Sequence, residues 1–77
     1  MKLSELEKGR VATVLKVNGD DASMEAKLRE VGFAENDEVE VLHLGPIGKT
    51  PLCVRLNQTL IALRQDEAAR IEVGLSQ

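Results

Sequence analysis

The sequence predicts a mainly β fold: a small, partly open barrel of about five strands, with one α-helix inserted after the first strand. Short runs of β-branched and other apolar residues alternate with turn residues along most of the chain. One stretch, at about residues 21–31, instead has the apolar spacing of a helix. The chain has 77 residues, which is enough for one domain with a thin core. We therefore expect residues 1–77 to form a single domain.

Strands are predicted where apolar residues alternate with polar ones or where β-branched residues cluster. Val39 and Val41, for example, alternate with Glu38 and Glu40, which is typical of a half-buried strand. Turn residues separate the runs, among them Asn18-Gly19-Asp20 and Asn57-Gln58-Thr59, the second of which is expected to close a hairpin. The expected strands are Arg10–Val17, Glu38–Leu44, Leu52–Leu56, Leu60–Arg64 and Ile71–Val73.

The inserted helix is expected to be capped by Asp20 or Asp21 and to run to about Val31. Gly32 stands where a left-handed C-cap residue belongs, and Phe33 is the apolar residue that closes such a cap. Apolar residues at i, i+4 and i+7 predict one buried stripe, made of Met24, Leu28 and Val31.

Two shorter helical turns are expected near the ends of the chain. Ser4 and Glu7 have capping-box spacing, which predicts a turn within Leu3–Lys8. A second turn is expected within Gln65–Arg70, just before the closing strand.

The segment Gly45–Pro51 is predicted to be the most irregular part of the chain. Its two glycines and two prolines argue against both a helix and a central strand, so a stiff exposed loop is expected. Gly45-x-x-Gly48-Lys49-Thr50 superficially resembles part of a phosphate-binding loop, but that motif needs four residues between its glycines and a helix after Lys-Thr. The loop is therefore a candidate for partner recognition and not for nucleotide binding.

Composition and charge exclude several classes of function. The net charge is −3, and the basic residues are spread from Lys2 to Arg70, which argues against a nucleic-acid binder. No apolar run approaches the ~20 residues that span a bilayer, so the chain is not expected to be membrane-embedded. The single cysteine and the charged N-terminal residues, which lack the apolar run of a signal peptide, favour the cytoplasm.

His43 and Cys53 are the only histidine and the only cysteine. A catalytic pair needs a sheltered pocket that so small a barrel hardly offers, so we expect no enzymatic activity. A structural zinc site needs four nitrogen or sulfur ligands, and these two residues cannot supply them. A weaker site of His43 with Glu40 is disfavoured because strand residues 40 and 43 point to opposite faces unless a bulge intervenes.

The strand Leu60–Arg64 carries apolar residues on both faces. Ile61 and Leu63 are expected to point into the core, which leaves Leu60 and Ala62 facing outward. These two side chains then lie either under the inserted helix or on a surface that binds a partner. Arg64 is expected to form an ordinary end-of-strand ion pair with Glu67.

Several segments follow one another in the order of a known family. They are Leu3-Ser4-x-Leu6-x-x-Gly9, Leu28-x-x-x-Gly32-Phe33, Asp37-x-Val39-x-Val41-Leu42, Gly45-Pro46-x-Gly48-x-x-Pro51-Leu52 and Ile61-Ala62-Leu63-Arg64-x-x-Glu67-Ala68-x-x-Ile71-x-Val73. Together they resemble FeoA domains over nearly the whole chain. Two positions depart from that pattern: Asn36 replaces the usual Gly, and Asn57-Gln58-Thr59 lacks a Gly often found there. Asn is the next-best residue for positive φ, so the turn at Asn36 is expected to persist.

The resemblance implies an SH3-like small barrel that serves ferrous iron transport as a cytoplasmic accessory or regulatory protein. Its implied partner is the cytoplasmic part of a membrane iron transporter with a GTP-binding domain. The alternative is a stand-alone metal-responsive module, similar to the SH3-like C-terminal domain of iron-dependent repressors, with weak iron or zinc binding. Weak self-association through an exposed strand edge is also left open. The expected partner-binding residues are Pro46, Ile47, Lys49, Pro51, Leu60, Ala62 and Arg64.

Overall fold

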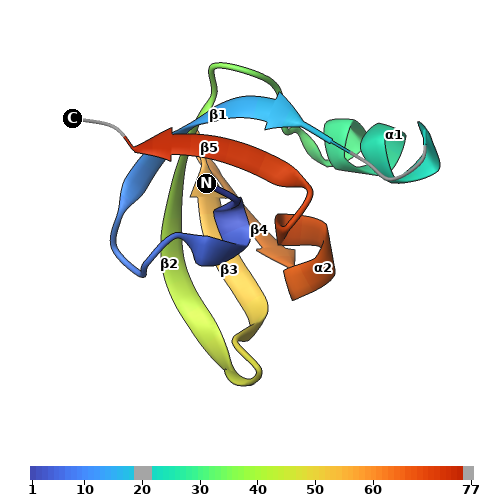
Figure 1. The fold of residues 1–77 in the computed structure, drawn as a ribbon. Helices are drawn as coiled ribbons and strands as arrows, with labels where there is room; N and C mark the ends of the chain where they lie inside the picture. Colours follow the sequence, from blue (N-terminus) through green and yellow to red (C-terminus); the bar gives the residue numbers. More distant parts are fainter. Residues whose placement is uncertain (19–21, 76–77) are drawn as a thin grey trace.

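The computed structural model describes residues 1–18 and 22–75. In these residues the strands form one antiparallel sheet in the order β4-β3-β2-β1-β5, with one longer helix after β1 (Figure 1). This confirms the predicted mainly β fold. The expected turn after Asn18 and the helix caps at Asp20 or Asp21 involve residues 19–21, which lie outside the described part. In chain order the elements are the 3₁₀ turn η1 (Leu3–Glu5), β1 (Val11–Val17), α1 (Ala22–Val31), β2 (Glu38–Ile47), β3 (Thr50–Leu56), β4 (Thr59–Leu63), α2 (Gln65–Ala68) and β5 (Ile71–Leu75).

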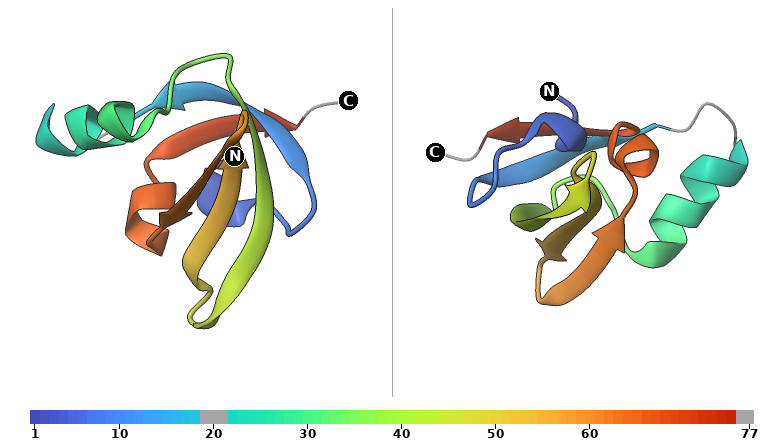
Figure 2. Two further views of the ribbon diagram at one scale, coloured as in Figure 1. Left: turned by 180° about the vertical axis from the view of Figure 1, so that it is seen from behind. Right: turned by 90° about the horizontal axis from the view of Figure 1, so that it is seen from below.

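The sheet curls around its core at β1, which pairs with β2 only through Val11–Thr13 and with β5 through Ala12–Val17, with a bulge between Val14 and Lys16. β1 and β5 cross over the layer that β2, β3 and β4 form (Figures 1 and 2). Every strand contributes buried aliphatic side chains to the space between, and Phe33 is the one aromatic residue among them. The fully buried larger side chains are Leu3, Val14, Leu28, Phe33, Val39, Val41, Leu52, Val54, Ile71 and Val73.

Helix α1 ends as predicted but packs through fewer residues. The Gly32 amide donates to the Arg29 carbonyl at 3.1 Å, and the Phe33 amide donates to the Leu28 carbonyl at 3.2 Å, the bonding pattern of a Schellman cap. Leu28 is fully buried, whereas Val31 is 40% exposed, so the predicted stripe is wrong at its last position. The reason is placement: α1 projects beside the barrel (Figure 2) and reaches the core through Leu28 and, in part, Met24.

The N-terminal turn is shifted from the one predicted. The Lys2 amide, not that of Ser4, donates to a carboxylate three residues on, the Oε1 of Glu5, at 2.8 Å. The turn covers Leu3–Glu5 only. The prediction of a Ser4–Glu7 capping box is therefore wrong by two positions, because the burial of Leu3 and Leu6 fixes which residues begin the turn.

The prediction of an irregular loop at Gly45–Pro51 is also wrong. β2 continues to Ile47 and β3 begins at Thr50, joined by a two-residue turn of Gly48 and Lys49, both at φ +61°. Such a turn matches the twist of a β-hairpin. The prolines are tolerated because β1 pairs only with Glu38–Glu40 of β2 and because β4 ends opposite Leu52. Each proline therefore lies where one side of its strand has no neighbouring strand, so its missing N–H leaves no carbonyl of such a neighbour without a donor.

The remaining turns agree with the sequence. Asn36 has φ 76°, as expected for the residue replacing Gly, and Asn57 has φ 55° in the turn before β4. α2 confirms the predicted helical turn before the closing strand. No helix within residues 1–18 and 22–75 is long and apolar enough to cross a membrane.

Candidate protein-interaction surface

The outer face of β2, β3 and β4 brings several predicted site residues into rows. His43 lies opposite Cys53, which lies opposite Ala62 on β4. One row along, Glu40 lies opposite Arg55, which lies opposite Leu60. Alternation places these side chains away from the core, since Leu52, Val54 and Leu56 between them are buried. Leu60 is 72% exposed and Ala62 is also exposed, so neither lies under α1.

A shallow apolar groove runs along this face next to β4. Its volume is about 260 Å³, and its lining is apolar. Alternation from Glu40 places Leu42 on the outer face, at the groove, and the bulge between Val41 and His43 brings His43 to the same face. The groove residues are Leu42, Cys53, Val54, Leu60, Ile61 and Ala62. We call this groove, with the exposed side chains of Leu60 and Ala62, the β4 surface.

The second predicted part of the contact surface is the end of the β2–β3 hairpin. Pro46, Lys49 and Pro51 are exposed there, and Ile47 is 81% exposed. The strand register places Pro51 only two residues along β3 from Cys53, the partner of Ala62. Gln65, shortly after β4, donates from Nε2 to the Lys49 carbonyl at 2.9 Å. Leu60 is farther away, since its partner Arg55 is six residues from Lys49, or roughly 20 Å at ~3.3 Å per residue. The hairpin end and the β4 surface therefore adjoin at Pro51 and Cys53, with Lys49 and Leu60 at their far ends.

Arg64 lies between these two sites, directly after β4, and is exposed. Its backbone amide donates to Oε1 of Glu67 at 2.9 Å, while its side chain is 3.9 Å from Asp66. The predicted Arg64–Glu67 ion pair is therefore wrong. Glu67 is only 6% exposed and turns toward α1, where Lys27 donates from Nζ to Oε2 at 2.6 Å.

Glu67, on α2, connects that helix to Lys27 on α1 and to Arg64, the residue directly after β4. Its carboxylate accepts from the amide at the start of α2 and from Lys27 on α1. The Arg64 amide and then the Lys27 ammonium stabilise the ionised form, and together they hold the pKa of Glu67 below its usual range despite its burial. No pattern in the sequence pairs residues 40 positions apart, so this contact could not be predicted.

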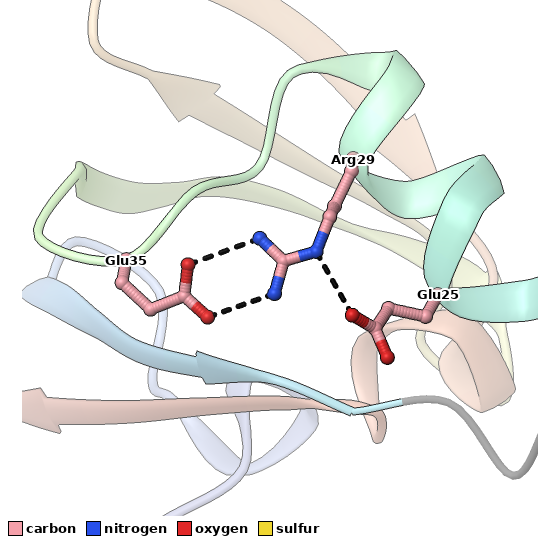
Figure 3. Close-up of polar contacts among 3 residues, drawn as sticks. All are labelled: Glu25, Arg29 and Glu35. Atoms are coloured by element: carbon pink, nitrogen blue, oxygen red, sulfur yellow. Dashed lines mark hydrogen bonds and ion pairs between the residues drawn. The ribbon is translucent and has the colours of Figure 1, made fainter. Parts of the chain in front are cut away.

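A second charged cluster fixes the loop after α1 (Figure 3). Arg29 donates through both terminal nitrogens to the two carboxylate oxygens of Glu35, at 3.0 and 2.9 Å, and through Nε to Glu25 at 3.0 Å. The guanidinium of Arg29 lowers the pKa of Glu35 to about 2. The two carboxylates in turn raise the pKa of Arg29. The cluster is exposed and holds the Phe33 segment in place.

The candidate metal ligands lie side by side. His43 and Cys53 are direct cross-strand partners, His43 exposed and Cys53 half-buried. Contrary to the prediction, Glu40 shares their face, because the bulge after Val41 resets the alternation. Its carboxylate is already engaged by Arg55. Among residues 1–18 and 22–75, no group of three His, Cys, Asp or Glu side chains is arranged to hold a metal ion.

The fold and this face define a small SH3-like domain with an exposed apolar surface. The FeoA domain model matches residues 1–75. The chain therefore belongs to the FeoA family, as its motifs suggested.

Three relatives show the range of this family. A Porphyromonas gingivalis Fe(2+) transport protein A/Fe(2+) transporter FeoB fusion protein is 32% identical over 75 residues, covering 97% of this chain and 9% of the fusion protein. This chain thus corresponds to a small part of that protein. A putative Fe(2+) transport protein A of Campylobacter jejuni is 31% identical, covering 97% of this chain and 99% of the relative. The crystal structure of Stenotrophomonas maltophilia FeoA complexed with zinc matches with 39% identity and a TM-score of 0.84, covering 96% of this chain and 89% of that one.

The same fold occurs in a manganese-dependent transcriptional repressor. The match covers 100% of this chain and 41% of the repressor, with a TM-score of 0.86. The identity is 18%, so the likeness shows the fold alone.

Proposed function

We propose that this chain, as one domain, is a cytoplasmic accessory or regulatory protein of ferrous iron transport that binds the cytoplasmic part of a membrane transporter with a GTP-binding domain. The main support for this proposal is the Porphyromonas gingivalis relative, in which transport protein A and the transporter FeoB form one polypeptide. When a short linker joins two domains, their effective concentration is roughly millimolar, so even a weak contact between them is formed most of the time. We expect this chain to make the same contact through its exposed side chains.

The β4 surface is the part of this chain best suited to that contact. Leu60 exposes most of its side chain beside an apolar groove, and transfer of such a side chain out of water favours binding. Arg64 adds a positive charge at the end of the same strand. The hairpin end, with Ile47 and Lys49, offers a second, smaller contact.

Calorimetric titration of this chain with the cytoplasmic part of its cognate transporter, with and without guanine nucleotide, tests the proposal. Leu60→Lys is expected to weaken binding by at least about tenfold, because one buried leucine contributes about 1.5–3 kcal/mol. Leu15→Lys is the matched control, since Leu15 is 57% exposed on β1, which two strands separate from β4 in the sheet. No binding in any nucleotide state, or equal loss in both variants, contradicts the proposal.

A metal-responsive module is the second candidate, and the juxtaposition of His43 and Cys53 favours it. The Stenotrophomonas maltophilia FeoA structure, complexed with zinc, gives a related precedent. Two ligands on an exposed face support only weak binding, because zinc usually takes four. Titration with Zn²⁺ or Fe²⁺ under anaerobic conditions should then give a weak response that His43→Ala abolishes. A response that His43→Ala leaves unchanged removes this candidate.

A further inference from the structure

The two edge strands of the sheet, β5 and β4, differ in whether other residues of the chain pair with their outer edge. β5 is covered by the N-terminal residues: Lys2 forms a bridge with Glu72, and the Val73 amide donates to the Met1 carbonyl at 2.7 Å. The N-terminal ammonium returns a hydrogen bond to the Val73 carbonyl at 3.1 Å. The border formed by β5 is therefore closed to another strand.

β4, the opposite border, has none of this cover in the described residues. Within residues 1–18 and 22–75 its only ladder is the one to β3, which runs without a bulge from Leu56↔Thr59 to Leu52↔Leu63. No charged residue and no proline occurs from Leu56 to Leu63. Charges, prolines and bulges are the devices that normally prevent border strands from pairing with other chains. Only the shortness of β4, five residues, limits such pairing.

The backbone of β4 has hydrogen-bonding groups that point away from β3. Antiparallel neighbours alternate between pairs that exchange both hydrogen bonds and pairs that exchange none. In a two-residue hairpin the pair next to the turn, here Leu56 and Thr59, is of the bonded kind. Leu60 and Ala62 are then of the other kind, so their amide and carbonyl groups are directed to the open border.

We infer that β4 is a self-association edge, at which two copies of this chain pair antiparallel about a two-fold axis at Ile61. Leu60 of each copy then lies opposite Ala62 of the other, so that a large side chain faces a small one on the outer face. The two Leu60–Ala62 pairs exchange four backbone hydrogen bonds and join the sheets of both copies into one. This inference does not depend on the proposed transporter contact.

Charge favours a second copy as the occupant. In this register Arg64 falls opposite Gln58 of the other copy, so no like charges are opposed along the whole strand. Arg55, in the row of Leu60, is already neutralised by Glu40. The contact is isologous, so each favourable or unfavourable change is applied twice.

A register-specific crosslink tests the inference. In a Cys53→Ser background, which removes the native thiol beside Ala62, Leu60→Cys and Ala62→Cys are made as separate variants and then mixed under mild oxidation. The mixture should form an intermolecular disulfide, because directly opposite residues are about 5.5 Å apart at Cα. Each variant alone should stay at background, since a residue and its own copy are then diagonal and about 7–8 Å apart. Equal crosslinking of the single variants, or none in the mixture, overturns the inference.

Sedimentation equilibrium gives a second readout without cysteines. The average mass of the unmodified chain should rise toward that of two copies with concentration. Leu60→Lys should weaken this association by at least about tenfold, because it is applied at two symmetric contacts. Leu15→Lys should leave it unchanged, and circular dichroism checks that both variants fold. A single-copy mass up to millimolar concentration, or dissociation by Leu15→Lys alone, overturns the inference. The first result would mean that the β4 edge is available only to other proteins.

Discussion

Removing the carboxylate of Glu67 should loosen the junction between α1, α2 and the end of β4. Glu67→Ala leaves the Arg64 amide without an acceptor and Lys27 without its partner. A hydrogen bond to a charged group contributes about 1.5–3 kcal/mol. The Lys27 part must be discounted, because Lys27 is 53% exposed and regains water when released. We expect a loss of about 2–3 kcal/mol from the free energy of unfolding, or a fall in Tm of roughly 10–20 °C.

The effect should depend on pH in a defined direction. The folded-state pKa of Glu67 is lowered, so its contribution is complete above the unfolded pKa of about 4.5 and is lost as the pH falls through the folded value. The difference in stability between the unmodified chain and Glu67→Gln should therefore be largest near neutral pH and shrink below about pH 4. Urea unfolding followed by circular dichroism at pH 7 and pH 3 measures both quantities.

A double-mutant cycle separates the two partners of Glu67. Lys27→Met with Glu67→Gln should give a coupling of about 1 kcal/mol at pH 7, and less at pH 3. A loss below about 0.5 kcal/mol for Glu67→Ala, or a coupling equal at both pH values, refutes the role given to this carboxylate.

Three further changes test other parts of the fold. Gly45→Ala should cost about 2–3 kcal/mol in urea unfolding, because a Cβ there would overlap the Thr50 carbonyl, well within 3.0 Å. Gly48→Ala meets no neighbouring atom but needs φ +61°, so it should cost only about 1 kcal/mol, and equal costs would contradict the close approach at Gly45. The Glu35 carboxyl carbon should titrate by NMR with a pKa of about 2 and return toward its ordinary value in Arg29→Ala; an unchanged midpoint would show that Arg29 is not its partner in solution. Trimming Leu28→Ala should destabilise by about 2–5 kcal/mol, whereas Val31→Ala should change stability by less than about 1 kcal/mol, and similar losses would place α1 differently.

Local patterns predicted most of the fold. The Gly32-Phe33 cap, the alternation in Glu38–Val41 and the turn at Asn36 each depend on neighbours in the sequence, and each was found where expected. Resemblance over the whole chain then fixed the SH3-like architecture and the family.

The errors arose where tertiary placement decides. The glycines and prolines of Gly45–Pro51 indicated a loop, but the missing strand neighbours beside Pro46 and Pro51 let the hairpin continue. Val31 has helical spacing, yet α1 touches the barrel over too short a length to bury it.

Site prediction had the same limit. Leu60 and Ala62 could be predicted to face outward, because alternation along one strand is local. That His43 opposes Cys53 depends on a bulge and on the register of two strands, neither of which single residues reveal. That the hairpin end adjoins the β4 surface at Pro51 and Cys53 follows from the same register.

Mapping the contact on this chain tests the proposed function most directly. ¹⁵N-labelled chain is titrated with the cytoplasmic part of its cognate transporter, and the amide shifts are followed residue by residue. Binding through the β4 surface predicts the largest changes at Leu60, Ala62 and Arg64, with Leu15 and Leu75 unaffected. Changes centred on Leu15 and Leu75, or none at saturating transporter, would contradict it.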